Sequence, residues 1–279
     1  MSISPGRILA KHGLKPQKKL GQHFLINPHT TQQIVKKAGI EPDDIVVEIG
    51  AGLGALTLPL AQKAKRVIAI EYDKKLMPVL EEVLQTHQLE NVEIWWGDAL
   101  KYDYEKTARE FNRKIKIIGN LPYYISSPLL FLFLYYQPHI AGLTLMLQKE
   151  VSERLKTKPG TKVYGLLSVL YALVAEVTLL MTLHPASFYP PPEVASQVVK
   201  IEWKPEGEKV EKPFITFLKQ IFSHRRKTIL NALKGYLQAE EIKKVLLANQ
   251  IDPHVRPEQI SPEQFLELYH AINKLGRAK

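Results

Sequence analysis

An amide, a proline and two aromatic rings follow one apolar segment of this chain. Asn120, Leu121, Pro122, Tyr123 and Tyr124 follow, after one intervening residue, a strand-like run at residues 115–118. If that run is a buried parallel strand, these residues lie at the carboxyl edge of a sheet, where open α/β sheets bind ligands. Pro122 has no N–H and disfavours a helical conformation at Leu121, so the nearby carbonyls stay available to a ligand. The alternative is a tight turn whose asparagine is a cap and whose tyrosines are core residues, and the local sequence favours neither.

These groups would suit the exocyclic amine of a nucleobase. The amine is a poor nucleophile because its lone pair is delocalised into the ring. If the Asn120 side-chain oxygen and the Leu121 carbonyl accept its two N–H bonds, the nitrogen can become pyramidal and direct its lone pair at an electrophile. The Tyr123 ring would stack on the base, a contact worth about 1–3 kcal/mol. Tyr124 is expected to be a packing residue.

A second set of residues could bind an adenosine-containing cofactor. Gly50 and Gly52 lie between a predicted strand and a predicted helix, where glycine permits a tight turn and close approach of a ligand. Glu71 ends the next predicted strand and could accept both ribose hydroxyls. Asp98 follows the third strand and could accept from an adenine amino group, although a helix N-cap is an equal alternative. NAD and S-adenosylmethionine both fit, and Glu48, two residues before Gly50, favours S-adenosylmethionine because the acid-Ile-Gly-x-Gly pattern resembles that of class I methyltransferases.

The spacing of apolar segments predicts the elements that hold these residues. Helical stretches separate the five predicted strands, which indicates an α/β fold with a doubly wound, mainly parallel sheet of the Rossmann-like class I methyltransferase type. These strands are predicted at residues 45–49, 67–70, 92–96, 115–118 and 143–147. Residues 177–183 and 198–203 are expected to form an antiparallel edge pair.

Changes in composition divide the chain into three predicted parts. Residues 1–26 form a basic N-terminal arm, expected to be a solvated tail, that ends in an apolar anchor. Residues 27–204 form the S-adenosylmethionine-dependent domain, and residues 205–279 a small helical RNA-binding domain that begins in a polar linker at 204–209.

Charge and composition narrow the class of partner. The 279 residues carry a formal net charge of +10, which favours phosphate-rich partners. The chain has no cysteine, and its 9 histidines lack metal-ligand spacing, so no metal is expected. Residues 163–183 are as long as a membrane span, but they are predicted to be a helix followed by a strand. The first residues lack an apolar signal core, which predicts a cytoplasmic protein.

Seven blocks, in order along nearly the whole chain, resemble the ribosomal RNA adenine N6,N6-dimethyltransferases, whose bacterial members act on small-subunit rRNA and confer kasugamycin sensitivity. The blocks are Gly21-Gln22-His23-Phe24-Leu25, residues 47–57 together with Glu71, Gly97-Asp98-Ala99, Asn120-Leu121-Pro122-Tyr123, Gln148-Lys149-Glu150-Val151, Phe188-x-Pro190-x-Pro192-x-Val194-x-Ser196, and Phe222-x-x-Arg225-Arg226-Lys227. Two positions depart from the family pattern: residue 23 is His where Asn is usual, and residue 51 is Ala where Pro is usual. The first departure leaves the role of His23 open.

The resemblance implies roles for individual residues. The predicted methyl-donor site comprises Gln22, His23, Leu25, Gly50, Gly52, Glu71, Asp98 and Asn120. The predicted catalytic residues are Asn120, Leu121, Pro122, Tyr123 and Phe188, with Tyr123 and Phe188 clamping a flipped adenine. Phe188 has the alternative of a core residue below a surface loop. Predicted RNA contacts are Lys18, Lys19, Arg225, Arg226 and Lys227, for which a solvated helix end is the alternative reading of the last three.

By resemblance, the expected function is S-adenosylmethionine-dependent dimethylation of two adjacent adenosines in a loop near the 3′ end of small-subunit rRNA. The expected partner is that rRNA within an immature 30S subunit, the expected state is a monomer, and no membrane partner is expected. The alternatives are a large-subunit rRNA methyltransferase of the macrolide-resistance type, a ribosome-assembly or transcription factor that needs no catalysis, and a nucleotide-dependent oxidoreductase.

Overall fold

The computed structural model describes residues 4–205 and 210–276 in two compact units. One unit runs to Ser152 and includes Val177–Trp203, and the other combines Glu153–Glu176 with the chain from Lys204 onward. Part of the predicted linker, residues 206–209, lies outside the described residues, as do 1–3 and 277–279. The helical unit therefore takes up a segment, residues 153–176, that the sequence analysis grouped with the sheet.

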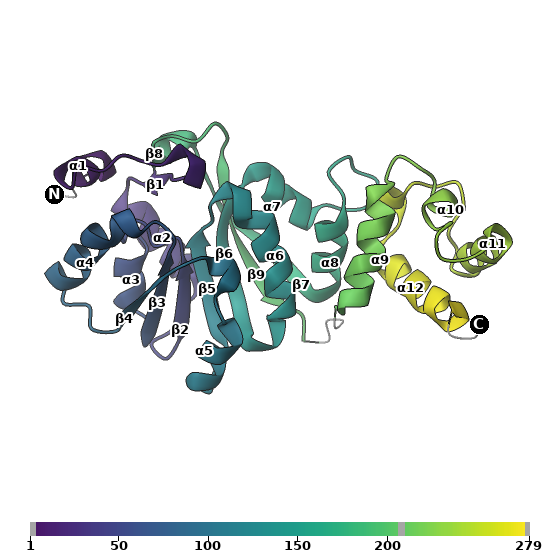
Figure 1. Ribbon diagram of the computed structural model, residues 1–279, viewed down its shortest axis with the longest axis horizontal. Coiled ribbons are helices and arrows are strands. Elements are labelled where there is room, and N and C mark those ends of the chain that lie inside the picture. The colour runs from purple at the N-terminus through teal and green to yellow at the C-terminus, as the bar shows by residue number, and fades with distance from the viewer. Residues whose placement is uncertain (1–3, 206–209, 277–279) are drawn as a thin grey trace. The chain divides into compact units, whose positions relative to one another are not determined.

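A seven-stranded sheet forms the centre of the first unit (Figure 1). Its order is β4-β3-β2-β5-β6-β9-β7, with the first five strands parallel and β9 antiparallel to β6. The strands are β2 (Ile45–Ile49), β3 (Arg66–Glu71), β4 (Val92–Trp96), β5 (Ile115–Asn120), β6 (Ile140–Gln148), β7 (Ala175–Leu183) and β9 (Ser196–Trp203). The prediction of a mainly parallel sheet with an antiparallel edge pair is confirmed.

Helices α3 (Thr57–Ala61), α4 (Met77–Thr86), α5 (Tyr104–Glu110) and α6 (Ser126–Tyr135) connect the parallel strands. Helix α2 (Pro28–Ala38) precedes β2, and α7 (Lys149–Lys156) follows β6. Ile34 and Val35 of α2 and Leu60 of α3 pack with Val46 of β2 in one buried cluster. Every residue of β2 is buried, as expected for a strand covered on both faces.

The N-terminal segment is folded, which corrects the expectation of a solvated tail. Helix α1 (Pro5–Lys11) buries Leu9, only 1% exposed, in a cluster with Phe24, Leu53 and Val79. Beyond it, the short strand β1 (Phe24–Leu25) pairs with β8 (Phe188–Tyr189) in a separate two-stranded sheet. The basic residues of this segment favoured the expectation of a solvated tail. The helix is stabilised by apolar contacts with residues far along the chain, which the local sequence does not show.

The second unit is helical. It contains α8 (Leu166–Val174), α9 (Lys212–Ser223), α10 (Ile229–Ala232), α11 (Ala239–Ala248) and α12 (Pro262–Gly276). Phe214 and Phe217 of α9 pack against the Tyr269 ring of α12, with ring centroids 5.2 and 5.4 Å away. Within the described ranges, no helix is long and apolar enough to cross a membrane.

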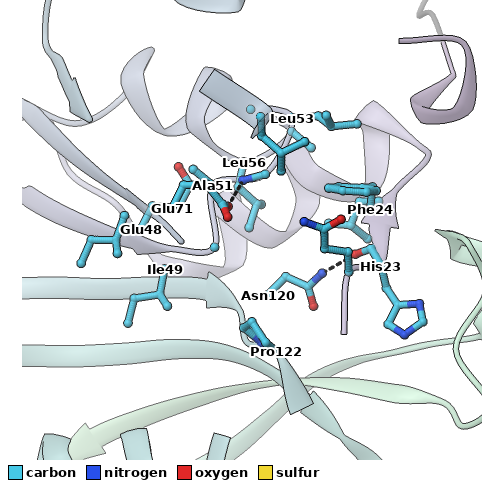
Figure 2. A pocket seen from close by; sticks show the side chains of 18 of the residues that line it. His23, Phe24, Glu48, Ile49, Ala51, Leu53, Leu56, Glu71, Asn120 and Pro122 are labelled. Carbon is cyan, nitrogen blue, oxygen red and sulfur yellow. Dashed lines mark hydrogen bonds between the residues drawn. The ribbon is translucent and has the colours of Figure 1, made fainter. Parts of the chain in front are cut away.

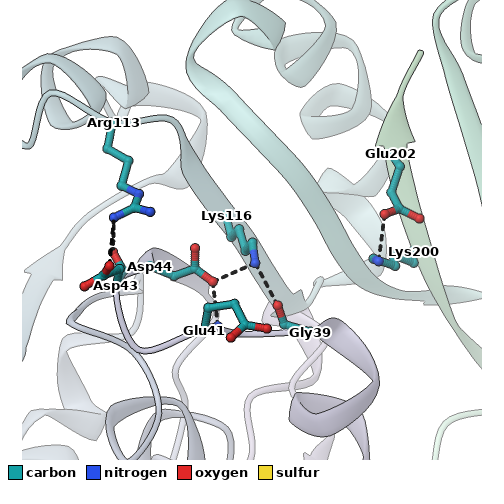
Figure 3. Close-up of polar contacts among 8 residues, drawn as sticks. All are labelled: Gly39, Glu41, Asp43, Asp44, Arg113, Lys116, Lys200 and Glu202. Carbon is teal, nitrogen blue, oxygen red and sulfur yellow. Dashed lines mark hydrogen bonds and ion pairs between the residues drawn. The ribbon is translucent and has the colours of Figure 1, made fainter. Parts of the chain in front are cut away.

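Charged residues at the amino end of β5 are paired with one another (Figure 3). Lys116 Nζ lies 2.6 Å from the Asp44 carboxylate and donates to the Gly39 carbonyl at 2.7 Å. The same Asp44 carboxylate accepts from the Glu41 backbone N–H at 2.7 Å. Arg113 donates to the Asp43 carbonyl at 3.0 Å. These contacts fix the turn that leads into β2 and hold it against β5.

Candidate active site

A cavity of about 640 Å³ opens at the carboxyl ends of β2, β3 and β5. It lies where the strand order reverses, since β2 continues to β3 on one side and pairs with β5 on the other. Ligands of open α/β sheets bind at this switch point. Figure 2 shows Glu48, Glu71 and Asn120 around the cavity. The structure therefore brings the predicted glycine loop, acids and asparagine together.

Two glycines are required by the backbone at this point. Gly52 has φ +58°, and a Cβ there would come within 3.2 Å of the Phe24 ring. A Cβ at Gly119 would lie 2.4 Å from the Ile49 carbonyl oxygen, so only glycine lets β5 run so close to β2. Sequence reasoning missed Gly119, which brings the next residue, Asn120, to the glycine loop.

The Glu71 carboxylate is held by backbone N–H groups. It accepts from Gly52 at 2.8 Å and from Asp73 at 2.7 Å. Burial raises the pKa of Glu71, and these two hydrogen bonds oppose the rise. The carboxylate is thus fixed at the cavity wall, in a position to accept hydroxyl groups of a ribose.

Glu48 is the more deeply buried acid, with 1% of its surface exposed. Burial raises the pKa of Glu48 to about 8, against a hydrogen bond from the Thr57 hydroxyl at 2.6 Å that lowers it. The neighbouring Glu71 raises it further. Among the described residues, neither acid forms an ion pair with a Lys, Arg or His. A cationic ligand in the cavity would therefore stabilise the ionised form of both acids.

Asp98 combines the two roles considered for it. Its Oδ1 accepts from the Leu100 N–H at 3.0 Å, so it caps a short 3-10 helix. Asp98 also lines the cavity. A carboxylate has further acceptor capacity beyond one hydrogen bond, so capping does not prevent contact with an adenine amine.

The side-chain amide of Asn120 has a defined orientation. Its Nδ2 donates to the His23 carbonyl at 2.7 Å, which leaves Oδ1 as the acceptor for an incoming N–H (Figure 2). The next carbonyl, that of Leu121, accepts no hydrogen bond from any described residue. By contrast, the Pro122 carbonyl accepts from Ile125 N at 3.1 Å and from Ser126 Oγ at 3.2 Å. Asn120 lines the cavity, whereas Leu121 is 1% exposed and does not line it. Two neighbouring residues thus carry acceptors without a donor among the described residues, the number that an amine with two N–H bonds requires.

The two predicted clamp residues differ in exposure. Tyr123 is half-buried, its hydroxyl lies 3.0 Å from Ser196 Oγ, and its ring stacks on His23 with centroids 5.6 Å apart. Phe188 is 2% exposed and packs in a core cluster with Leu25 and Leu183. As placed, Phe188 corresponds to the alternative reading of a core residue, and its ring does not line the cavity.

Sequence reasoning misjudged Tyr124 and missed Asp73. Tyr124 is 54% exposed and lines the cavity, so the interpretation of Tyr124 as a packing residue is wrong. Asp73 accepts from the side chains of Gln17 and Gln22, which ties the N-terminal segment to the end of β3. Gln22 thus serves as a tether. The position of Asp73, two residues after Glu71, is the sequence feature that could have indicated its place at the end of β3.

The predicted RNA contacts lie in both units. Lys18 and Lys19 are exposed in a short 3-10 helix, and Lys19 lines the cavity. Arg226 and Lys227 are exposed directly after α9. The Arg225 guanidinium already donates one hydrogen bond within its own unit, to the Lys162 carbonyl at 2.9 Å.

Sheet order, glycine loop and acidic strand end together define a class I methyltransferase. Known structures agree with this class. A dimethyladenosine transferase from Plasmodium falciparum superposes with a TM-score of 0.78 at 29% identity, over 91% of this chain and 98% of that one. The 23S rRNA methyltransferase ErmE shares the fold, with a TM-score of 0.66 at 24% identity over 90% of this chain and 99% of that one.

Sequence comparison identifies the family. The family described as ribosomal RNA adenine dimethylase matches residues 13–274, and the chain belongs to it. The "Ribosomal RNA small subunit methyltransferase A" of Syntrophus aciditrophicus (strain SB) is 41% identical, over 96% of this chain and 98% of its own. That of Alkaliphilus metalliredigens (strain QYMF) is 40% identical, over 95% and 96%. The protein is an rRNA adenine dimethyltransferase that uses S-adenosylmethionine, and the oxidoreductase alternative is wrong.

Proposed function

We propose that this enzyme dimethylates the N6 amines of two adjacent adenosines in a loop near the 3′ end of small-subunit rRNA, within an immature 30S subunit and as a monomer. The choice of the small subunit is supported by the names of relatives that match almost end to end. The chemistry is supported above all by one observation: at the carboxyl end of β5, Asn120 Oδ1 and the Leu121 carbonyl accept no hydrogen bond from the described residues, and Asn120 lines the cavity.

The donor half of the site is assigned to the glycine loop and its acids. S-adenosylmethionine supplies an electrophilic methyl group on a positively charged sulfur. Glu71 would accept the ribose hydroxyls, and Asp98 the adenine amine. Gly50 and Gly52 let the ligand approach the backbone. The buried Glu48, whose pKa burial raises to about 8, would lose its proton more readily when a cationic ligand binds nearby.

The acceptor half of the site is assigned to the residues after β5. Asn120 Oδ1 and the Leu121 carbonyl would accept the two N–H bonds of the target amine and orient its lone pair toward the donor side of the cavity. No base is needed before attack, because the amine is neutral. The new N–C bond would form as the sulfur–methyl bond breaks, the sulfur would leave as a neutral thioether, and the methylated nitrogen would then lose its proton to water. The same slot must readmit a monomethylated amine, whose one remaining N–H can use either acceptor.

RNA phosphates would bind the exposed basic residues of both units. Lys19 lines the cavity and Lys18 precedes it in the same short helix, while Arg226 and Lys227 form a second group on the helical unit. Stem-loop RNA whose target bases are extruded suits a protein that combines such residues with an aromatic ring beside the site.

The test is transfer of tritiated methyl groups from S-adenosylmethionine to purified ribosomal particles. We expect label in the rRNA of immature small subunits isolated from cells that lack this enzyme. Large subunits from the same cells are the matched control. Label in large-subunit RNA with none in the small subunit would favour the resistance-type alternative and contradict the proposal. RNA binding without any methyl transfer would favour an assembly factor.

A further inference from the structure

The loop that carries Asp98 follows β4 and forms part of the cavity wall. Residues 97–100 all line the cavity. The first of them, Gly97, donates its N–H to the Glu71 carbonyl at 2.9 Å, which joins the loop to the end of β3. The Asp98 carboxylate accepts from a backbone N–H two residues later, so it is held within the loop as well. The position of Asp98 against an adenine therefore depends on what supports this loop from outside the cavity.

Tyr104, the first residue of α5, contacts the loop from outside the cavity. Its hydroxyl donates to the carbonyl of Ala99, the neighbour of Asp98 in the chain, at 2.8 Å. Tyr104 is 0% exposed and does not line the cavity. Burial raises the pKa of the Tyr104 phenol, so the hydroxyl keeps its proton and remains a donor. Tyr104 can thus influence a bound ligand only through the loop.

Neighbouring rings fix the orientation of the Tyr104 side chain. The rings of Tyr102 and Phe133 pack edge-on against it, with centroids 5.1 and 5.7 Å away. Tyr102 in turn packs edge-on against Trp95, with centroids 5.1 Å apart. Edge-to-face packing is a favoured geometry of aromatic pairs, so a rotation of Tyr104 would disturb several contacts. The hydroxyl is therefore held in one direction, toward the Ala99 carbonyl.

The Trp95 indole lies directly against the start of the loop. A Cβ at position 97 would lie 2.4 Å from the indole, so any residue other than glycine would displace that ring. Trp95, Tyr102 and Tyr104 thus form one aromatic cluster that contacts the loop at Gly97 and at Ala99. Because none of these three rings lines the cavity, the cluster supports the loop from outside it.

We propose that Tyr104 is a positioning residue for adenine recognition in the methyl donor. Its hydroxyl fixes the loop at Ala99 and thereby holds the Asp98 carboxylate where it can accept from the exocyclic amine of the donor's adenine. Tyr104 contributes to selectivity for a purine that carries this amine, without touching the ligand. The inference rests on the proposed function, since it needs Asp98 to contact the adenine amine.

The experiment compares two ligands that differ in that amine. S-adenosylhomocysteine carries it, and S-inosylhomocysteine has a carbonyl oxygen in its place. Calorimetry measures both dissociation constants for the wild type and for Tyr104→Phe, which keeps the ring and removes the hydroxyl. We expect Tyr104→Phe to weaken binding of S-adenosylhomocysteine about fivefold, equivalent to about 1 kcal/mol for one neutral hydrogen bond. Binding of S-inosylhomocysteine should stay within about twofold, so the selectivity for the adenine ligand falls.

Tyr164→Phe is the matched control for a lost buried hydroxyl. Tyr164 is also 0% exposed, its hydroxyl donates to the Ile260 carbonyl at 2.9 Å, and it does not line the cavity. This variant should lower the melting temperature about as much as Tyr104→Phe and leave both dissociation constants unchanged. For methylation of small-subunit RNA, Tyr104→Phe should raise KM for the donor about fivefold and keep kcat within about twofold.

A double-mutant cycle tests whether Tyr104 acts through Asp98. In an Asp98→Ala background, Tyr104→Phe should cause no further loss of S-adenosylhomocysteine affinity, because the contact that it positions is already gone. Losses that add in the double variant would show that Tyr104 acts by another route and would overturn the inference.

Two results for Tyr104→Phe alone would also overturn it. The first is equal weakening of both ligands, which would indicate a structural role without selectivity. The second is an unchanged affinity for S-adenosylhomocysteine. A wild-type protein that binds the two ligands equally would instead show that Asp98 does not contact the amine, and would contradict the donor half of the proposed function together with this inference.

Discussion

Charged side chains near the two ends of strand β5 differ in whether they have a partner of opposite charge. At the amino end, Lys116 is paired with Asp44 at 2.6 Å, and its ammonium also donates to a backbone carbonyl. At the carboxyl end, beyond Gly119 and Asn120, the neighbouring acids Glu48 and Glu71 accept only from backbone N–H groups and one hydroxyl among the contacts of the described residues. The charges at the amino end are therefore neutralised within the folded protein, whereas the acids at the carboxyl end have no cationic partner among the described residues.

This difference marks the end that binds a ligand. A buried carboxylate without a cation is costly, which is why burial raises the pKa of Glu48 to about 8. A ligand with a sulfonium and an ammonium group offsets that cost on binding. The uncharged Asn120 side chain is likewise only partly satisfied. Its Nδ2 donates to the His23 carbonyl, whereas its Oδ1 accepts no hydrogen bond from the described residues. Substitutions at the carboxyl end should therefore impair function, and those at the amino end should impair stability.

The largest effect is expected for Asn120→Ala. It removes an acceptor that orients the target amine, and loss of one such preorganised hydrogen bond lowers kcat by about 10²–10³. Affinity for S-adenosylhomocysteine should change less than tenfold. The measurement is single-turnover methyl transfer to small-subunit RNA beside calorimetry.

Asn91 provides the matched control, because its Nδ2 already donates to the Ala61 and Ala64 carbonyls at 2.9 Å each. Asn91→Ala should lower the melting temperature and keep kcat. If Asn120→Ala also kept its kcat, the amide would not orient the amine.

The next effect is a pH dependence that Glu48→Gln should weaken. Between pH 4.5, the ordinary pKa, and about 8, Glu48 is protonated in the folded protein and ionised in the unfolded chain. The folded state then holds more protons, so stability falls as pH rises through this window, by at most about 1.4 kcal/mol per pH unit. Burial raises the pKa of Glu71 as well, which adds a contribution of the same sign.

Donor affinity should change in the opposite direction, because a cation binds the ionised acid. In the wild type, S-adenosylmethionine should bind more tightly as pH rises from 6 to about 8, the pKa of Glu48. Glu48→Gln should flatten both the stability and the affinity profiles. Denaturant titration and calorimetry at several pH values measure them, and profiles that stay parallel in wild type and variant would refute the assignment to Glu48.

The smallest functional effect is expected at the amino end. Lys116→Met leaves the nearly buried Asp44 without its cation and should cost about 1–3 kcal/mol of stability, with donor affinity and kcat unchanged. Lys200→Met, which breaks the more exposed pair with Glu202 in Figure 3, should cost less than about 1 kcal/mol. Equal destabilisation by both substitutions would show that the Lys116 network has no special role.

The parallel core could be predicted from the sequence because burial on both faces leaves uninterrupted apolar runs. The predicted strand at residues 45–49 has the observed bounds for this reason, since every residue of β2 is buried. The predicted strand at residues 92–96 also has the observed bounds, although β4 is an edge strand whose residues are only partly buried or exposed. Glu71, Asp98 and Asn120 follow such runs, so the carboxyl edge that collects them was also predictable.

Features that depend on distant partners were not predictable. Phe188 stands in a proline-rich stretch, and its burial follows from pairing with Leu25, far away in the sequence. The sequence of helix α1 is typical of a charged tail. Its fold depends on the burial of Leu9 against Leu53 and Val79, which are distant in the sequence. Tyr124 resembles the neighbouring apolar residues, and only the turn after β5 exposes it.

The most direct test identifies the methylated atom. Small-subunit RNA treated with the wild-type enzyme and S-adenosylmethionine is digested to nucleosides and analysed by mass spectrometry against synthetic standards. An exocyclic amine held by Asn120 Oδ1 and the Leu121 carbonyl predicts N6,N6-dimethyladenosine. Methyl groups found only on ring nitrogens or on ribose would contradict this slot.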